Sequence, residues 1–286
     1  MSIKKCKIKD WLRRRMFHKE SPSLSKYKNN IHLNMPDNNF VTRNIEPWKT
    51  LVREQLCAKA IQLHENDTNR KDEDYFVLKP SPLNFCTCHS NDGKRHFCIA
   101  PSSNLFARLI TDEDYIRRVV RDFPDEFGTG DPASVLHALW KQDPNYPNIE
   151  FERFCEMVGH EQYAWIVEYD DNGVVGDKYL RLDLFRFIDN KDGKKEFRGG
   201  ILHLLKHFSF QGTPLSYEQN GDDIPNIHYV LRTIIEAFFL SSWEKEVHGL
   251  KVDYVAKVPH KNYTLKAVFF KNEDAGVYFI NSLHII

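Results

Sequence analysis

Two histidines and a lysine, His203, Lys206 and His207, are the residues of this 286-residue sequence that are best suited to do chemistry. If residues 197–208 form a helix, with about 100° between successive side chains, all three lie opposite an apolar stripe. Imidazole groups exchange protons near neutral pH, so this face is a candidate acid–base site. A metal-chelating pair of imidazoles and an ordinary solvated face are the alternatives, although the sequence does not have the His-Glu-x-x-His pattern of metalloproteases.

The same predicted helix begins with two glycines, Gly199 and Gly200. Glycine destabilises a helix, so the pair has a cost for folding. It also leaves backbone N–H groups open at a helix N-terminus, which is a favourable setting for a phosphate group. The glycine pair therefore favours a site for a phosphate ester over a face that is only solvated.

The last third of the sequence carries a second group of candidates in Lys266, Ser282 and His284. Residues 250–271 contain five lysines and one acidic residue, Asp253, with aromatic residues between them. Cations beside aromatic rings are typical of surfaces that bind single-stranded RNA. Lysines that keep a sheet edge from aggregating are the alternative. The candidate contacts to nucleic acid are Lys206, Lys257, Lys261 and Tyr263.

Three cysteines and a histidine surround a predicted β-turn near Asp92. A hairpin centred there pairs Cys86 with Cys98 and Cys88 with His96, so that all four side chains project from the same face of the sheet. Thiolates and imidazoles arranged in this way suit tetrahedral zinc. The Cys-x-Cys spacing differs from the usual Cys-x-x-Cys knuckle, however, and buried free cysteines or a disulfide are the alternatives.

Helices and strands alternate along the chain and must position these candidates. Hydrophobic periodicity and turn signals predict helices over 46–65, 111–123, 131–142, 149–158, 197–208 and 225–246. They predict strands over 75–78, 84–89, 96–100, 105–110, 162–168, 178–188, 250–258, 263–270 and 277–285. The expected fold class is α+β, with a helix-rich N-terminal region that contains a short β-hairpin, followed by a C-terminal antiparallel sheet packed on two helices.

Composition and predicted secondary structure change along the chain. They divide it into a basic arm and linker (1–44), a mixed α/β N-terminal domain of unknown role (45–160) and a C-terminal α+β domain (161–286). Residues 1–30 hold ten lysines and arginines against two acids, although the whole chain has no net charge. Such an arm suits nucleic acid or acidic lipid, or is a solvated tail. Six cysteines without a secretion signal, and no apolar run of membrane-spanning length, predict a soluble cytoplasmic protein.

Two runs in the C-terminal third carry a family resemblance. They are Phe-Arg-Gly-Gly-Ile-Leu-His-Leu-Leu-Lys-His at 197–207 and the ending Lys-Ala-Val-Phe-Phe-Lys … Gly-Val-Tyr-Phe-Ile-Asn-Ser-Leu-His at 266–271 and 276–284. Together with the order of two helices and then antiparallel strands, they resemble the barnase–EndoU–colicin–RelE group (BECR fold) of ribonucleases, in particular its phage- and toxin-associated branch.

The resemblance implies metal-independent cleavage of RNA by attack of the ribose 2′-hydroxyl on the adjacent phosphate, with no cofactor. It implies that His203 and His207 share the base and acid roles, that Lys266 stabilises the phosphorane, and that Ser282 and His284 position the phosphate. It also implies a toxin or defence role, with an inhibitor of the antitoxin or immunity type as a partner. A non-catalytic module that binds nucleic acid or protein, and a zinc protein built on the Cys86–Cys98 hairpin, remain the alternative functions.

Overall fold

The computed structural model describes residues 47–65, 85–102, 104–111, 113–123, 132–142, 147–151, 154, 163–184, 187–189, 195–197, 200–202, 204, 227–249, 251–260 and 263–286. Several predictions fall outside these residues: the basic arm, the strand over 75–78, most of the helix over 149–158, and the candidates His203, Lys206, His207 and Lys261.

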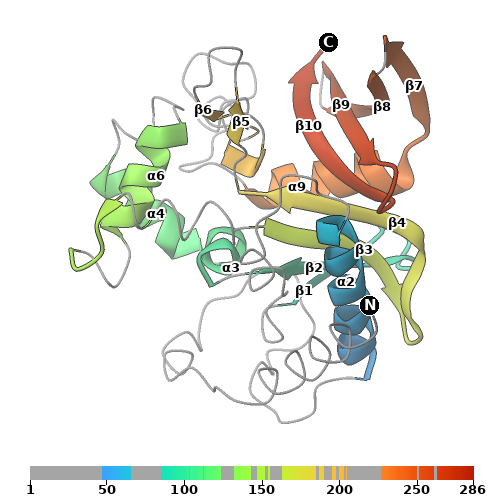
Figure 1. The fold of residues 1–286 in the computed structure, drawn as a ribbon, viewed down its shortest axis with the longest axis horizontal. Coiled ribbons are helices and arrows are strands. Elements are labelled where there is room, and N and C mark those ends of the chain that lie inside the picture. The colour runs from blue at the N-terminus through green and yellow to red at the C-terminus, as the bar shows by residue number, and fades with distance from the viewer. Residues whose placement is uncertain are drawn as a thin grey trace.

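Five α-helices and a π-helical turn lie within the described part of the chain (Figure 1). They are α2 (Pro47–Glu65), α3 (Asn104–Thr111), α4 (Glu113–Asp122), α6 (Pro132–Lys141), α9 (Ile227–Ile235) and η4 (Glu236–Leu240), which continues α9 as a π-helix. The helices predicted over 46–65, 111–123 and 131–142 are confirmed as α2, α4 and α6, apart from their end residues.

The strands form one eight-stranded sheet and one strand pair. The strands are β1 (Cys86–His89), β2 (His96–Pro101), β3 (Tyr163–Asp170), β4 (Gly173–Asp183), β5 (Phe187–Asp189), β6 (Lys195–Phe197), β7 (Trp243–His248), β8 (Lys251–His260), β9 (Tyr263–Asn272) and β10 (Val277–Ile285). In the large sheet the order is β1-β2-β3-β4-β10-β9-β8-β7, while β5 pairs with β6. The expected mixture of helices and strands is confirmed.

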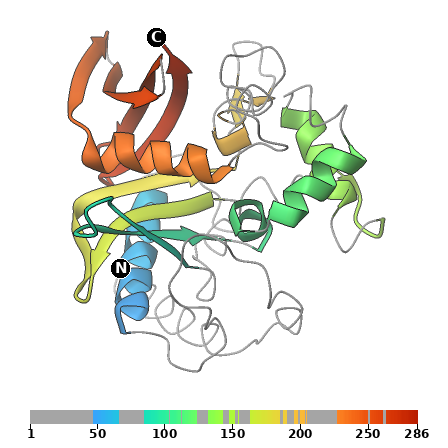
Figure 2. The same cartoon turned by 180° about the vertical axis from the view of Figure 1, so that it is seen from behind.

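A short parallel seam joins the two halves of the large sheet. All neighbouring strands are antiparallel except β4 and β10, which pair over only three residues of each, Tyr179–Arg181 with Val277–Phe279. A register shift follows between Ile280 and Ser282, so β10 leaves β4 and continues beside β9 alone. Figures 1 and 2 show the result: β7–β10 rise away from the layer that contains β3 and β4. The sheet is continuous across residues 160/161, because β2 pairs with β3.

Two hydrophobic clusters lie on opposite faces of the sheet. The larger one contains the apolar residues of α9 and η4, together with those of α3, α4 and α6 and the buried Ile201, Leu202 and Leu204. These three confirm that the predicted apolar stripe of the 197–208 segment faces the core. The smaller cluster places α2 on the other face of β3 and β4, and Figure 2 shows α9 and α2 on either side of this layer.

Helix α2 holds the two β-turns that border the seam. The backbone N–H of Val174, just after the β3–β4 turn, donates to Gln55 Oε1 at 2.7 Å. Lys59 Nζ donates to the Ala275 carbonyl at 2.8 Å, in the β9–β10 turn. Gly173 has φ of +106°, and a Cβ there would lie 2.5 Å from Gln55 Oε1, so a larger residue would disturb this contact.

The helix predicted over 225–246 ends early, and this prediction is wrong beyond residue 240. Side chains cap the last carbonyls: Arg95 Nη1 donates to Phe239 O at 2.9 Å, and Trp243 Nε1 donates to Ala237 O at 3.1 Å. Arg95 is itself held by two 2.7 Å bonds to the carboxylate of Glu168 on β3. Because these long-range donors satisfy the helix end, residues 243–248 are released to form strand β7.

Two strand predictions are also wrong. Residues 105–110 belong to helix α3, because Phe106 and Leu109 are buried three positions apart, which is helical spacing. The strand expected over 178–188 begins at Gly173 and ends at Asp183, and residues 187–189 pair with β6 instead. Within the described residues, no helix combines the length and apolar character needed to cross a membrane.

Replacing Phe238 by Ala should lower the free energy of unfolding by about 3–5 kcal/mol, because the ring is fully buried and the cavity cannot close. The ring lies 4.9 Å from that of Trp243 and 5.1 Å from that of Phe269, so the core joins helix and sheet there. Urea unfolding measures the change. Leu240→Ala, at a position that is 42% exposed, should alter the free energy of unfolding by less than about 1 kcal/mol. An equal loss of unfolding free energy in the two variants would contradict this account of the core.

Candidate functional site

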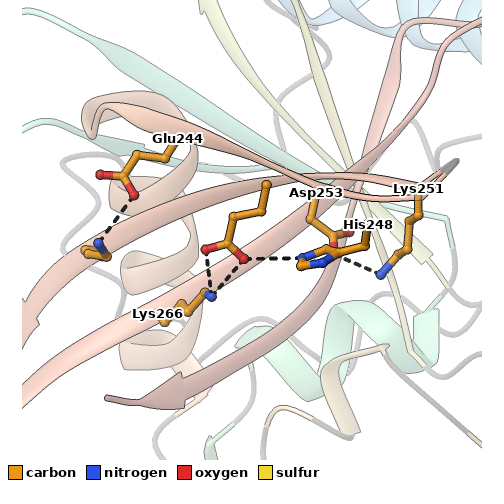
Figure 3. Close-up of polar contacts among 7 residues, drawn as sticks. Glu244, His248, Lys251, Asp253 and Lys266 are labelled. Atoms are coloured by element: carbon orange, nitrogen blue, oxygen red, sulfur yellow. Dashed lines mark hydrogen bonds and ion pairs between the residues drawn. The ribbon is translucent and has the colours of Figure 1, made fainter.

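A row of charged side chains covers the face of β7, β8 and β9 that is turned away from α9 (Figure 3). Trp243 packs on Phe238 of η4. The side chains of β7 alternate between the face that bears Trp243, where Lys245 and Val247 are exposed, and the opposite face. We call the opposite side the charged face. Its residues are Glu244, Glu246 and His248 on β7, Lys251, Asp253 and Lys257 on β8, and Lys266 on β9.

The centre of the charged face is a line of three groups, Lys266, Glu246 and His248. Lys266 Nζ donates to both oxygens of Glu246, at 2.9 and 3.0 Å, and His248 Nε2 lies 3.6 Å from Glu246 Oε2 (Figure 3). The exposed fraction of the side chain rises from 23% at Lys266 to 34% at Glu246 and 62% at His248. A reactant therefore reaches this line from the imidazole end.

The Lys266 ammonium lowers the pKa of the Glu246 carboxyl from its usual 4.5, because it donates hydrogen bonds to the ionised form. His248 adds a smaller effect in the same direction. The carboxylate thus stays charged over the neutral range. It holds a cation on one side and orients an imidazole on the other, which is the arrangement that general acid–base catalysis needs.

The other lysines of the charged face also have carboxylate partners. Lys257 Nζ lies 3.3 Å from Glu244 Oε2, and Lys251 Nζ lies 2.9 Å from Asp253 Oδ2. The second oxygen of Asp253 is buried and has no hydrogen-bond partner within the described part of the chain. The lysine-rich sheet expected from the sequence is therefore balanced by acids, because β7 brings two glutamates alongside it.

The structure brings His284 to the same face as Lys266, because the two residues lie directly opposite each other on β10 and β9. The register shift after Ile280 places Ser282 opposite Val268, two residues from Lys266 on β9, so Ser282 lies diagonal to Lys266 on the same face. Both His284 and Ser282 are partly exposed. His284 is thus a neighbour of Lys266 on the adjacent strand.

Two other candidates lie on the β8–β9 hairpin, where Lys257 is directly opposite Lys266. Lys257 is exposed and occupied by its ion pair with Glu244. Tyr263 is 43% exposed and lies opposite His260, at the β8–β9 turn. Lys206, Lys261, His203 and His207 fall outside the described residues, so their positions relative to the charged face remain predictions.

Sequence reasoning missed Glu244, Glu246 and His248 as site residues. The reason is that a helix was predicted to continue through Glu246, which scatters these three side chains around a cylinder. The run Trp-Glu-Lys-Glu-Val-His at 243–248 offers only a weak signal for a strand, because its two apolar residues, Trp243 and Val247, are four positions apart with the polar Lys245 between them. Only the pairing of β7 with β8 places Glu244, Glu246 and His248 beside the other charged side chains.

The register expected for the cysteine hairpin is wrong by one residue. The loop closes between Ser90 and Arg95, because Ser90 N–H donates to Arg95 O at 2.9 Å. Cys88 consequently lies opposite Phe97, while His96 lies opposite His89. A one-residue slip moves every side chain of one strand to the other face, so the common face that zinc would require is lost.

The cysteines are separated between the two cores. Cys86 belongs to the α9-side cluster, whereas Cys98 belongs to the α2-side cluster. Burial raises the pKa of Cys86 to about 12 and that of Cys88 to about 11, and it raises the pKa of Cys98 well above 9.0. No group of three or more His, Cys, Asp or Glu side chains in the described part of the chain is placed to hold a metal ion.

Comparison of the chain with known protein families, with curated proteins and with solved structures finds no match.

Replacing Glu246 by Gln should reduce stability at neutral pH but not in acid. Because the folded-state pKa lies below the ordinary value of 4.5, the pair with Lys266 contributes stability above that value and loses it as the pH falls through the folded pKa. Unfolding in urea at about pH 7 and about pH 3 measures the difference. In a Lys266→Met background the effect of Glu246→Gln at neutral pH should shrink to the small contribution of His248; an effect of undiminished size would contradict the pairing.

Cys86 and Cys98 should resist alkylation by iodoacetamide at about pH 8, since burial blocks access and keeps the thiols protonated. Peptide mass spectrometry should find both unmodified in the native protein and modified in urea. Added EDTA should make no difference. Protection that EDTA removes would contradict this account and indicate a metal-held cluster.

Proposed function

We propose that this protein is a metal-independent endoribonuclease whose active site includes the charged face. The observation that carries the proposal is the line of Lys266, Glu246 and His248, in which a cation and an imidazole are held by one ionised carboxylate. Cleavage of RNA by its own 2′-hydroxyl needs a base, an acid and a cation near the phosphate, and no metal. The C-terminal third resembles BECR-fold ribonucleases, and the chemistry that this resemblance implies requires the same groups.

In the proposed reaction His248, oriented by Glu246, takes the proton of the ribose 2′-hydroxyl. The 2′-oxygen forms a bond to phosphorus while the bond to the 5′-oxygen breaks, which leaves a 2′,3′-cyclic phosphate and a 5′-hydroxyl. Lys266 stabilises the negative charge that develops on the phosphorane. A second imidazole gives the proton to the leaving oxygen, and His284, His203 and His207 are the candidates for this role.

The balance of charges favours catalysis over simple retention of RNA. A surface that only binds phosphates needs cations that are free to replace counterions. On the charged face Lys251, Lys257 and Lys266 each have a carboxylate partner instead. The imidazole of His248, 3.6 Å from the Glu246 carboxylate, supplies the type of group that exchanges protons near neutral pH.

The proposal includes the remaining expectations from the sequence. The protein acts in the cytoplasm as a toxin or defence effector and is held in check by an inhibitor protein. The N-terminal region is helix-rich, and the closing strands form the nuclease domain with α9 and the helical segment that carries Ile201, Leu202 and Leu204. Ser282 and the candidate RNA contacts Lys261, Lys206 and Tyr263 position the phosphate backbone, and Lys257 joins them by exchanging its partner Glu244 for a phosphate.

Incubation with total RNA in EDTA tests the proposal. The wild-type protein should produce fragments that end in 2′,3′-cyclic phosphate. His248→Ala and Lys266→Ala should each reduce the rate by about 100-fold or more, as loss of an acid–base or charge-stabilising group does. The double variant His203→Ala/His207→Ala should reduce it as well, if these residues supply the acid.

Lys271→Ala is the matched control for Lys266→Ala. Lys271 is on the same strand and pairs with Glu273 at 2.7 Å, but it lies on the other face, over the ring of Tyr278. Its removal should leave the rate unchanged. Intact RNA with the wild-type protein, or cleavage that EDTA abolishes, would contradict the proposal, and RNA that is bound but uncut would indicate a non-catalytic binding module.

A further inference from the structure

Three aromatic rings form one compact group on the side of β7–β10 that is opposite the charged face. They are Trp243 on β7, Tyr254 on β8 and Tyr278 on β10, and their ring centroids lie 5.2 to 5.8 Å apart. The sheet coils enough to bring these rings together, although β7 and β10 are separated by two strands. We call the three residues the ring group. It packs on Phe238 at the margin of the larger core cluster.

A lysine ammonium lies over each ring of the ring group. The distance from Nζ to the ring centroid is 4.2 Å for Lys178 on Trp243, 5.5 Å for Lys245 on Tyr254 and 5.7 Å for Lys271 on Tyr278. The attraction arises because the face of an aromatic ring is the negative side of its quadrupole. The ring has no net charge, however, so it orients an ammonium without neutralising it.

Two of these three ammonium groups keep their full charge. Lys271 pairs with Glu273 at 2.7 Å and lowers the pKa of that carboxyl, to which Lys245 adds only the smallest contribution. Within the residues that the structure describes, neither Lys178 nor Lys245 has a carboxylate at ion-pair distance, and both side chains reach solvent. On the charged face, by contrast, each described lysine has a carboxylate partner. Cations without such partners are the ones that displace counterions from a polyanion.

The edge strand β7 connects the ring group to the proposed active site. It is the last strand of the large sheet, and no described strand pairs with its outer side (Figure 1). Lys245 lies between Glu244 and Glu246 in this strand, and its side chain projects from the opposite face. A polynucleotide that crosses the edge at Lys245 therefore passes from the two unpaired cations to the line of Glu246 and His248.

We infer that Lys178 and Lys245 hold the phosphate backbone of single-stranded RNA beside the active site, on a strand that crosses the β7 edge. This inference rests on the proposed ribonuclease function and adds a binding surface to it. A single strand can bend round the edge, whereas a stiff duplex cannot, so the surface selects unpaired RNA. Phosphates carry no sequence information, and the surface therefore holds RNA of any sequence.

Binding of a labelled 2′-O-methyl RNA oligonucleotide, which cannot undergo attack by the 2′-oxygen, tests the surface at several salt concentrations. Lys178→Met and Lys245→Met remove the charge but keep a flexible apolar side chain over the ring. Each should reduce the slope of log affinity against log salt by about 0.7, the value for one phosphate contact to a single strand. This corresponds to about fivefold in affinity for each tenfold change in salt. Lys245→Arg should keep the wild-type slope, because it keeps the charge.

Lys271→Met is the matched control, because this ammonium also lies over the ring group but is paired with Glu273. It should leave the slope unchanged. Glu273→Gln should release the third ammonium and increase the slope by about 0.7. An unchanged slope in Lys178→Met and Lys245→Met, or an equal reduction in Lys271→Met, would contradict the surface.

Cleavage of unmodified RNA separates the surface from the proposed function. Lys178→Met and Lys245→Met should raise KM and leave kcat unchanged, since neither ammonium contacts the reacting phosphate. If the wild type cleaves RNA but the salt slopes do not respond, the surface is wrong and the ribonuclease stands. If the slopes respond but RNA stays intact, the surface stands and the proposed function fails. Phosphatidylserine vesicles should not compete with the oligonucleotide; competition that Lys245→Met removes would overturn the assignment to RNA and indicate a membrane surface.

Discussion

The three-residue parallel seam between β4 and β10 is the constraint on which the rest of this fold depends. It joins two antiparallel meanders, β1–β4 and β7–β10, that would otherwise be separate sheets. Helix α2 fixes the turns at its border through Gln55 and Lys59. Because the seam is short and a register shift follows it, the second meander leaves the plane of the first. The α2-side cluster reaches the near edge of this meander through Ala275, Val277 and Phe279. The charged residues lie beyond that edge, on β7, β8 and β9.

The end of helix α9 decides which residues the charged face contains. A π-helical turn at Glu236–Leu240, with carbonyls capped by Arg95 and Trp243, converts the chain from helix to strand. π-helical turns are rare and often lie near functional sites. Here the turn delivers Glu244, Glu246 and His248 to the edge of the sheet. Arg95 and Glu168 thus connect the first meander to the proposed site without touching it.

The pairing of lysines with carboxylates on β7–β9 changes the function that the lysine-rich residues 250–271 can be expected to have. Taken alone, residues 250–271 suggest a phosphate-binding surface. With β7 in place, Lys257 and Lys266 are paired with its glutamates, and Lys266 becomes part of a line that ends in an exposed imidazole. The proposed function therefore depends on proton transfer at His248 more than on net positive charge.

The sequence by itself determined the elements whose signals are local. Helices α2, α4 and α6, the hairpin around Asp92 and the three closing strands follow from periodicity and turn residues over a few positions. Tertiary structure decided the rest: where α9 stops depends on Arg95, far away in the chain, and the one-residue register of the cysteine hairpin depends on how its loop closes. Lys266 and His284 were predicted as site residues from their types alone. Glu246 and His248 were not, because a side chain's partner across a sheet is set by strand order and register, which no local pattern contains.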